Sequence, residues 1–384
     1  MNIGIICYPT YGGSGVIATE LGKSMGAQGH KVHFISYDQP ARLDFFSENL
    51  FYHEVSVSEY PLFKYPPYEI ALSSKIVEIV KSAELDILHV HYAIPHAAAA
   101  VMAKSVLREE GIHIPIVTTL HGTDITLVGK DETYGPVIRY SLERSNGVTA
   151  VSDSLRRDTQ YIFKFNKHIE VIPNFVDFSR FTRQPKEHFK KAIAPNGERI
   201  VLHTSNFRKV KRVGDVLKIF NLISKEVPSK LLMVGDGPER VKLERQCRDS
   251  EMCDKVTFLG KQDAVEEILS VGDLFLMPSE TESFGLAALE AMACEVPVIS
   301  SNTGGLPEVN IDGVTGYTCE VGDIKTMAEK GISILKEDDV LADFKTNALN
   351  HARKYDIDLI CPKYEAYYLE AIENQQRELA TFAS

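Results

Sequence analysis

The segment from Leu274 to Ala293 carries the residues whose types and spacing are best suited to chemistry. Its glutamates Glu282 and Glu290 lie eight positions apart and flank the turn Ser283-Phe284-Gly285-Leu286. The apolar run before the turn predicts a strand ending at Pro278, and a helix is expected to begin around Ser283 to Gly285. Unpaired N–H groups at a helix start suit a phosphate. One helix through both glutamates would separate them by about 12 Å along its axis, enough to bracket a diphosphate. A capped helix with one exposed glutamate explains the pair equally well when it is taken alone.

A basic cluster follows another predicted strand, in the stretch Ser205 to Arg212. Its candidate ligand-binding residues are Asn206, Arg208 and Lys211. Cations at the start of a helix oppose the helix dipole, so an anion bound nearby explains them better than a solvated helix start does. After a further strand, Gly235 allows a tight turn close to a nucleotide, although a plain loop would have the same sequence.

The first half of the chain has its own glycine turn, Pro9 to Val16, directly after the first predicted strand. Gly15 and the two glycines before it would let the backbone approach a ligand closely, and Ser14 offers a hydroxyl. The pattern is not G-x-G-x-x-G, and no acidic residue marks a dinucleotide ribose. A nicotinamide-dependent dehydrogenase is therefore disfavoured, and an ordinary strand-to-helix loop is the alternative.

Histidines gather at two further strand ends, His89 to His96 and Thr118 to Asp124. No carboxylate or cysteine completes a metal-ligand set near the first group, so a metal site is not expected. We expect Tyr92 and His121 to face a cleft, with a hydrogen-bonded structural histidine as the alternative for His121. Arg144, in the next predicted helix, either lies on the surface or pairs with an anionic substrate, for which its guanidinium fork is suited.

The elements that must position these residues alternate between short apolar runs and longer amphipathic stretches. Such alternation is typical of parallel strands covered by helices on both faces, so each half is expected to form a doubly wound, Rossmann-like α/β domain. The predicted strands are Ile3–Cys7, Val32–Ile35, Ile87–Val90, Ile116–Leu120, Ile200–His203, Lys230–Val234, Val256–Leu259, Leu274–Met277 and Val296–Ser300.

We place the first domain at residues 1–172, a linker with a surface helix at 173–195, and the second domain at 196–361. The linker is expected because charged residues replace apolar runs there. The aromatic stretch 362–384 is expected to be helical and to pack back on the first domain. Two such sheets would each present the carboxyl ends of their strands to ligands, one holding a donor and the other an acceptor.

Composition narrows the class of protein. A formal net charge of -11 over 384 residues disfavours a general nucleic-acid binder. The six cysteines form no C-x-x-C pair, which fits a reducing compartment better than a disulfide scaffold. The N-terminus does not read as a signal peptide, and no apolar run is long enough to span a bilayer. We therefore expect a cytoplasmic protein that binds neither membrane nor nucleic acid.

The segments Glu282-Ser-Phe-Gly-Leu286 and Glu290-Ala-Met-Ala-Cys294 resemble the E-x7-E signature of retaining glycosyltransferases of family 4, which have the two-lobed GT-B fold. The resemblance implies that Glu282 contacts the donor sugar and Glu290 the ribose hydroxyls. It places His121 against the donor sugar and Lys211 against the departing diphosphate. The family's arginine is displaced, with Asn206 at its usual position and Arg208 two residues later. Donor contacts are expected for Gly15, Asn206, Gly235, Ser283, Phe284, Gly285, Leu286 and Glu290. One departure is Glu295, where the family usually has glycine.

Stretches along nearly the whole chain, among them His91-Tyr-Ala-Ile-Pro-His96, further resemble the family members of the bacillithiol pathway. This resemblance implies transfer of GlcNAc from UDP-GlcNAc to the hydroxyl of L-malate, with retention of the α configuration and no metal cofactor. The malate carboxylates would be held by Ser14, Tyr92, Thr119 and Arg144. A homodimer is compatible with the same resemblance.

Three alternatives remain open at this point. The same fold could transfer a sugar to another small anionic or glycan acceptor, or act as a UDP-GlcNAc epimerase, or bind the nucleotide sugar as a sensor without catalysis. UDP release that requires malate distinguishes the synthase from the epimerase and from the sensor.

Overall fold

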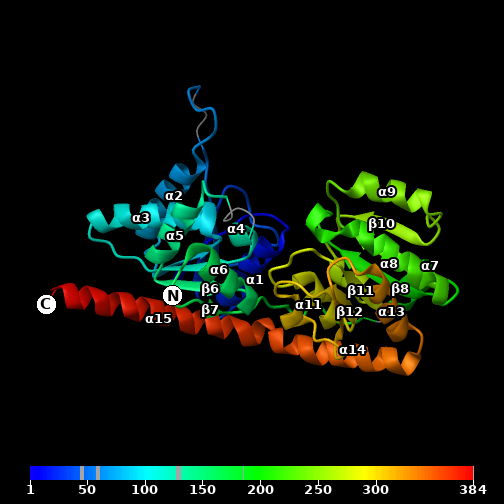
Figure 1. The fold of residues 1–384 in the computed structure, drawn as a ribbon. Coiled ribbons are helices and arrows are strands. Elements are labelled where there is room, and N and C mark those ends of the chain that lie inside the picture. The colour runs from blue at the N-terminus through cyan, green and yellow to red at the C-terminus, as the bar shows by residue number, and fades with distance from the viewer. Residues whose placement is uncertain (44–46, 58–60, 127–130, 185, 384) are drawn as a thin grey trace. The chain divides into compact units, whose positions relative to one another are not determined.

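The computed structural model describes residues 1–43, 47–57, 61–126, 131–184 and 186–383 (Figure 1). The chain divides into two compact units. The first comprises Met1–Asn174 together with Ile357–Ser384, and the second is Phe175–Asp356. Each unit is a parallel sheet with helices on both faces, as the alternating pattern predicts.

The first unit is built on a seven-stranded parallel sheet in the order β3-β2-β1-β4-β5-β6-β7. Its strands are β1 (Asn2–Ile6), β2 (Lys31–Ser36), β3 (Leu50–Glu54), β4 (Ile87–His91), β5 (Ile116–Leu120), β6 (Gly147–Ala150) and β7 (Glu170–Val171). The order reverses between β1 and β4, because β2 and β3 lie on one side of β1 and all later strands lie on the other.

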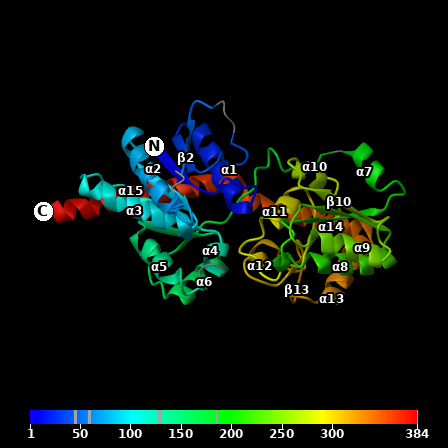
Figure 2. The same cartoon turned by 90° about the horizontal axis from the view of Figure 1, so that it is seen from above.

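Helices cover both faces of this sheet (Figure 1, Figure 2). On one face, α2 (Tyr68–Ser82) and α3 (Ala98–Glu109) pack side by side and share a buried apolar cluster with β1, β2, β4 and β5. The other face carries α1 (Gly13–Ala27) and α15 (Ile357–Ala383), which contact each other. The remaining helical segments of the described chain are η1 (Ala93–Ala97), α4 (Thr123–Thr126), α5 (Gly135–Arg144) and α6 (Asp153–Phe163).

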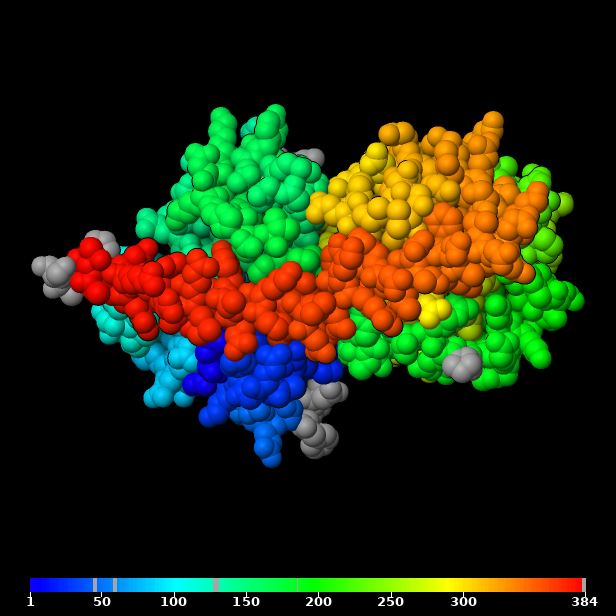
Figure 3. All heavy atoms as spheres, turned by 90° about the horizontal axis from the view of Figure 1, so that it is seen from below, coloured from blue at the N-terminus to red at the C-terminus, as the bar shows by residue number. Residues whose placement is uncertain are grey.

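The helix α15 belongs to the first unit although it ends the sequence (Figure 3). Its Tyr364 and Tyr368 are fully buried, four positions apart, so both lie on the face turned to the sheet. The Tyr368 hydroxyl hydrogen-bonds His89 Nδ1 of β4 at 2.6 Å. The helix begins at Ile357, five residues before the expected start at 362.

The second unit has a six-stranded parallel sheet in the order β10-β9-β8-β11-β12-β13. Its strands are β8 (Arg199–Thr204), β9 (Ser229–Val234), β10 (Val256–Gly260), β11 (Leu274–Met277), β12 (Val298–Ser301) and β13 (Gly316–Cys319). Here the order reverses between β8 and β11.

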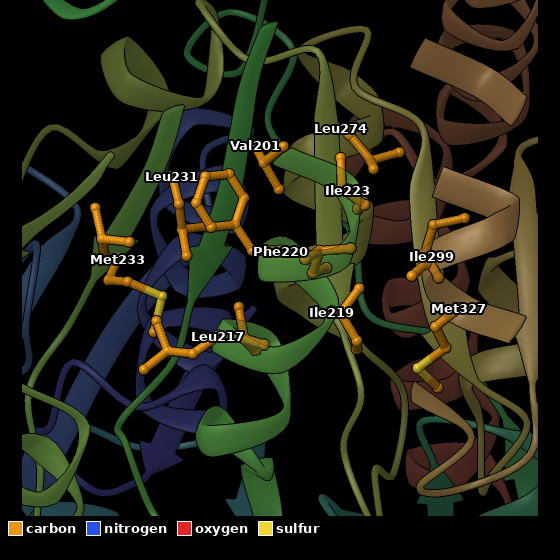
Figure 4. Close-up of a cluster of buried hydrophobic side chains, with 14 of the residues drawn as sticks. Val201, Leu217, Ile219, Phe220, Ile223, Leu231, Met233, Leu274, Ile299 and Met327 are labelled. Carbon is orange, nitrogen blue, oxygen red and sulfur yellow. The ribbon is translucent and has the colours of Figure 1, made fainter. Parts of the chain in front are cut away.

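One face of this sheet is covered by α8 (Val213–Glu226), α9 (Arg240–Asp249) and α13 (Ile324–Leu335), joined at its edge by α14 (Asp338–Ala352). Phe220 and Ile223 of α8 pack with Val201, Leu231 and Leu274 of the strands in one buried cluster (Figure 4). Helices α10 (Val265–Leu269) and α11 (Leu286–Ala293) contact each other, and α11 also contacts β11, β12 and α14. Shorter helical segments are η3 (Lys209–Lys211), α12 (Leu306–Val309) and η4 (Arg353–Tyr355).

The stretch expected to be a linker is for the most part a structural piece of the second unit, which begins at Phe175. Its helix α7 (Glu187–Ile193) is surface-exposed, as expected. Ion pairs tie the stretch down, however: Arg180 with Glu266 at 3.0 Å and Lys190 with Asp273 at 3.8 Å. Several of the basic residues that suggested a linker are therefore partners of acids in the second unit. Among the described helices, none has the length and apolar character needed to cross a bilayer.

Candidate active site

In each sheet, the strands at which the strand order reverses are followed directly by the motifs identified in the sequence. In doubly wound sheets, ligands bind outside the carboxyl ends of the strands at such points. In the first unit these are the ends of β1 and β4, followed by the Pro9–Val16 turn and by Tyr92. In the second unit they are the ends of β8 and β11, followed by the basic stretch and by the Glu282 turn.

The N-terminus of α1 offers unpaired backbone N–H groups at the end of β1. Neither a side-chain cap nor an acidic residue occupies its first turn, and Ser14 is partly exposed there. This arrangement suits an anion. Gly15 is buried, and a Cβ at this position would lie 2.4 Å from the Thr10 carbonyl oxygen. The structure therefore explains this glycine by close packing of its own loop rather than by an exposed contact to a donor.

Tyr92 and His121 lie next to each other after β4 and β5. Their rings stack with centroids 5.5 Å apart, and the Tyr92 hydroxyl hydrogen-bonds Thr123 Oγ1 at 2.7 Å. The Tyr92 backbone is left-handed, with φ of 87°, which is uncommon for a residue other than glycine. Strained backbone of this kind concentrates at functional sites. Both residues are partly exposed, so both side chains can reach a ligand.

His121 belongs to a pair of neutral histidines. Its Nε2 hydrogen-bonds Nδ1 of the fully buried His91 at 2.8 Å. Burial lowers the pKa of His121 to about 3 and that of His91 well below its usual value. His121 is therefore uncharged at neutral pH, so it can orient a sugar hydroxyl through hydrogen bonds but cannot serve as a cation.

The histidines of β4 hydrogen-bond neighbouring side chains. Both ring nitrogens of His89 are engaged, Nδ1 by Tyr368 and Nε2 by Thr119 Oγ1 at 2.7 Å. No group of three or more metal-ligating side chains comes together among the residues described.

The structure does not expose Thr119, which was expected to bind the acceptor. Its side chain is fully buried, and its hydroxyl hydrogen-bonds His89 and, at 2.6 Å, Thr149. Strand alternation explains this placement, because every second side chain of β5 points to the face covered by α15. At the end of a strand, the residues exposed to a ligand are those that follow the last residue paired with a neighbouring strand.

Arg144, also expected to bind the acceptor, lies away from the carboxyl ends of the strands. Arg144 is the last residue of α5, and two residues later the Asn146 N–H donates to the carbonyl of Ile116, the first residue of β5. His121 follows the other end of β5, and five residues of strand span about 16 Å. Arg144 therefore lies at the amino edge of the sheet. There it stacks over Tyr140 and lines a surface pocket of about 440 Å³ with Arg139, Lys164 and Lys167.

In the second unit, His203 connects the two strands at the reversal point. Its Nδ1 donates to the Leu276 carbonyl of β11 at 2.8 Å, so its Nε2 accepts from the Ser205 hydroxyl at 2.8 Å. Ser205 Oγ in turn accepts from the Phe207 N–H at 3.3 Å. His203 thus shapes the start of the basic loop. The sequence alone shows it only as the last residue of a predicted strand.

The basic loop places Lys211 against Glu282. The Lys211 ammonium lies 2.5 Å from Glu282 Oε2, and both side chains are largely buried. The Glu280 N–H also donates to the Val210 carbonyl at 2.7 Å. The loops after β8 and β11 are therefore joined by side chain and by backbone. Asn206 and Arg208 are both exposed on the same loop, so either can reach a ligand.

The Glu282 turn differs from the helix that the sequence suggested. α11 begins at Leu286 with Gly285 as its N-cap, so Glu282 lies outside the helix and the separation of 12 Å along one axis does not apply. The Glu282 carbonyl accepts the Gly305 N–H at 2.9 Å, which fixes the turn. Ser283 and Leu286 are partly exposed, as is Glu290 within α11.

Phe284 is 3% exposed and meets Tyr355 edge-on at 5.8 Å, so its side chain is a core residue and not a donor contact. Gly235 follows β9 with φ of 118°, and a Cβ there would lie 1.8 Å from the Ser205 carbonyl oxygen. Only glycine fits where the β9 turn crosses the basic loop, as the tight turn predicts.

Comparison with known proteins agrees with this geometry. Residues 11–180 match the model of Glycosyltransferase Family 4, and residues 184–351 match that of Glycosyl transferases group 1. A protein of Bacillus anthracis, N-acetyl-alpha-D-glucosaminyl L-malate synthase, is 46% identical over 378 residues, which cover 98% of each chain. The chain belongs to the family 4 glycosyltransferases.

Solved glycosyltransferase structures share its fold. Sucrose-phosphate synthase from Thermosynechococcus elongatus matches with a TM-score of 0.80 and 21% identity, covering 97% of this chain and 100% of that chain. Anabaena Alr3699/HepE in complex with UDP gives 0.79 and 19%, covering 96% and 100%. This family 4 glycosyltransferase thus has the GT-B architecture, and the two family models divide between its two units.

Proposed function

We propose that this glycosyltransferase transfers GlcNAc from UDP-GlcNAc to the hydroxyl of L-malate, with retention of the α configuration. The single observation that carries the proposal is the 46% identity, over 98% of both chains, to the N-acetyl-alpha-D-glucosaminyl L-malate synthase of Bacillus anthracis. The product would serve bacillithiol biosynthesis.

The second unit supplies the proposed donor site. The diphosphate would lie at the start of α11, near Lys211 and the exposed Arg208 or Asn206, where N–H groups and cations meet. Glu282, held by Lys211 and by the Gly305 N–H, would orient the sugar, and Glu290 the ribose. The Lys211–Glu282 pair supports this proposal because it fixes the ammonium beside the turn that would hold the sugar.

The first unit supplies the proposed acceptor site. Ser14 and the N–H groups of α1 would receive one malate carboxylate, and Tyr92 would hydrogen-bond the other. His121, being neutral, would position the donor sugar through hydrogen bonds. Thr119 and Arg144 take no part.

In the proposed reaction, the malate hydroxyl attacks the anomeric carbon from the face that the diphosphate leaves. The new C–O bond forms as the bond from that carbon to the β-phosphate oxygen breaks, and a departing phosphate oxygen takes the hydroxyl proton. Lys211 and backbone N–H groups stabilise the negative charge on UDP, which is the main catalytic contribution of the protein. We expect no metal to be required, because Lys211, the exposed Arg208 and backbone N–H groups would together stabilise the leaving diphosphate.

The test follows UDP release and product mass with UDP-GlcNAc as donor, with and without L-malate and with and without EDTA. We expect UDP release that requires malate, is unaffected by EDTA, and gives a product of the mass of GlcNAc–malate. UDP release without malate would favour the epimerase, binding without release would favour a sensor, and loss of activity in EDTA would overturn the metal-free mechanism.

We also propose a cytoplasmic location, supported by the cysteines. All six are free, and five of them are buried. The homodimer is a proposal from family resemblance, and light scattering of the purified protein measures it.

A further inference from the structure

Asp124 lies between the two turns that carry Tyr92 and His121. Its side chain is 1% exposed. Oδ2 accepts the Ala93 N–H at 2.9 Å, and Oδ1 accepts the Gly122 N–H at 2.9 Å. One carboxylate therefore bonds the residue directly after Tyr92 and the residue directly after His121.

The bond to Ala93 matters because the backbone before it is strained. Tyr92 has φ of 87°, and such a conformation persists only where the surroundings hold it. The Tyr92 N–H donates to the Thr119 carbonyl at 3.0 Å on one side of the residue, and the Ala93 N–H donates to Asp124 on the other. The carboxylate thus holds the strained residue from its C-terminal side.

We propose that Asp124 is a positioning residue that clamps the Tyr92 turn to the His121 turn and so sets the acceptor site. The inference rests on the proposed function for its kinetic consequence, but the clamp itself is a property of the first unit. A carboxylate is required because both oxygens accept from N–H groups. An amide has one carbonyl oxygen, and its NH2 group would face a second donor.

The substitution Asp124→Asn removes one hydrogen bond of the clamp and can keep the other. The amide oxygen can keep the local bond to Gly122, two residues away, while the bond to Ala93 is replaced by two donors facing each other. Amide hydrogen exchange should therefore accelerate in peptides spanning 92–97 and change less in peptides spanning 120–126.

The KM for L-malate should rise about tenfold or more, the amount expected for a lost hydrogen bond to a charged group. The KM for UDP-GlcNAc and the affinity for UDP should stay within about twofold, because the proposed UDP site lies in the second unit and the retained bond to Gly122 keeps the His121 turn in place.

Asp273→Asn is the matched control. Asp273 is also 1% exposed and accepts a backbone N–H, that of Ile200 at 3.0 Å, but it lies in the second unit beside Lys345. This variant should lose stability without changing the KM for malate or exchange at 92–97. If Asp124→Asn does not fold, Asp124→Ser, which is smaller and leaves no NH2 group, tests the same bond.

The proposal is overturned if Asp124→Asn exchanges like the wild type at 92–97 and binds malate normally. It is equally overturned if both substrates' KM values shift alike and Asp273→Asn does the same, which would mean general destabilisation. If the wild-type enzyme does not use malate, the proposed function fails, and hydrogen exchange alone still decides the clamp.

Discussion

At the scale of single residues, Lys211 and Glu282 are the charged pair on which the proposed donor chemistry depends. Their ion pair joins the loops after β8 and β11, the two strands at the reversal point of the second sheet. Glu282 thereby gains a fixed orientation from a cation that would also face the diphosphate. The two roles of Lys211 can be separated by substitution.

Lys211→Ala should lower kcat by about 100- to 1000-fold, the usual effect of removing one group that stabilises a developing oxyanion. Lys211→Arg keeps the charge and should retain a larger share of activity. The control is Lys218→Ala, which removes an exposed lysine paired with Asp215 at 3.1 Å and should leave kcat unchanged. Steady-state kinetics with UDP-GlcNAc and L-malate measures all three, and near-normal turnover of Lys211→Ala would refute its role.

Residue types at strand ends pointed to Tyr92, His121, Lys211 and Glu282, and the structure places each of them after the carboxyl end of a parallel strand. The same reasoning failed for Arg144, since placing it required the length of α5, which carries the chain to the opposite edge. Asp124 and His203 could not be recognised from the sequence. Their importance comes from hydrogen bonds to backbone groups of neighbouring strands and turns, which no local pattern records.

At the scale of elements, the C-terminal end of α11 has Glu295 at a position where glycine is the preferred residue. Glu295 has φ of 59°, and its N–H donates to Met292 while the Val296 N–H donates to Ala291. This is the Schellman arrangement, in which glycine is preferred at the left-handed position. The position is the one at which the family usually has glycine.

Glu295→Gly should therefore stabilise the protein by about 1 kcal/mol, the cost of left-handed backbone in a residue with a Cβ. The partner Arg183 lies 4.0 Å away and its weak, half-exposed ion pair offsets little of this gain. Thermal unfolding measures the change, with Glu337→Gly as a control at the non-helical N-cap of α14, where φ is -114°. A fall in Tm for Glu295→Gly would contradict the account of this helix end.

The elements themselves were predictable to different degrees. The fully buried strands β4 and β5 are rich in apolar and β-branched residues and were predicted within two residues. The edge strand β3, Leu-Phe-Tyr-His-Glu, is mostly half-exposed and contains no β-branched residue. β6 and β13 have four residues each and begin with glycine, so they carry little pattern of their own. Their strands form because neighbouring strands supply the pairing.

At the scale of the whole molecule, buried histidines should make the first unit sensitive to acid. Burial lowers the pKa of His89 to about 3, of His96 to about 4 and of His121 to about 3, and lowers that of His91 further. An unfolded histidine titrates near 6.5. Stability from these groups is fully present above that pH and is lost as pH falls from 6.5 towards their folded values. Each pH unit costs up to about 1.4 kcal/mol per histidine.

Hydrogen exchange at pH 7 and pH 5 tests this expectation. Burial also lowers the pKa of His33 and His53, so among the described residues the first unit holds six such histidines and the second unit holds two, His203 and His351. Peptides of the first unit should therefore lose more protection at pH 5 than those of the second unit. The raised pKa of Asp124 acts in the opposite direction, but it is one group against six. Equal loss of protection in both units would show that these histidines do not set acid stability.

The two units supply different groups to the proposed substrates. The second unit supplies cations and N–H groups suited to a diphosphate, and the first supplies the start of α1, Tyr92 and neutral His121. Of the four residues expected to bind malate, the structure buries Thr119 and places Arg144 at the opposite edge of the sheet. The proposed acceptor site therefore uses fewer side chains, and we propose that Asp124 sets their backbone.

The most direct measurement of the central claim is the structure of the product formed from UDP-GlcNAc and L-malate, determined by mass spectrometry and by NMR of the anomeric proton. The account predicts GlcNAc joined through an α linkage to the malate hydroxyl, formed in equal amount to the UDP released. A β-linked product, or UDP released with no GlcNAc–malate, would contradict it.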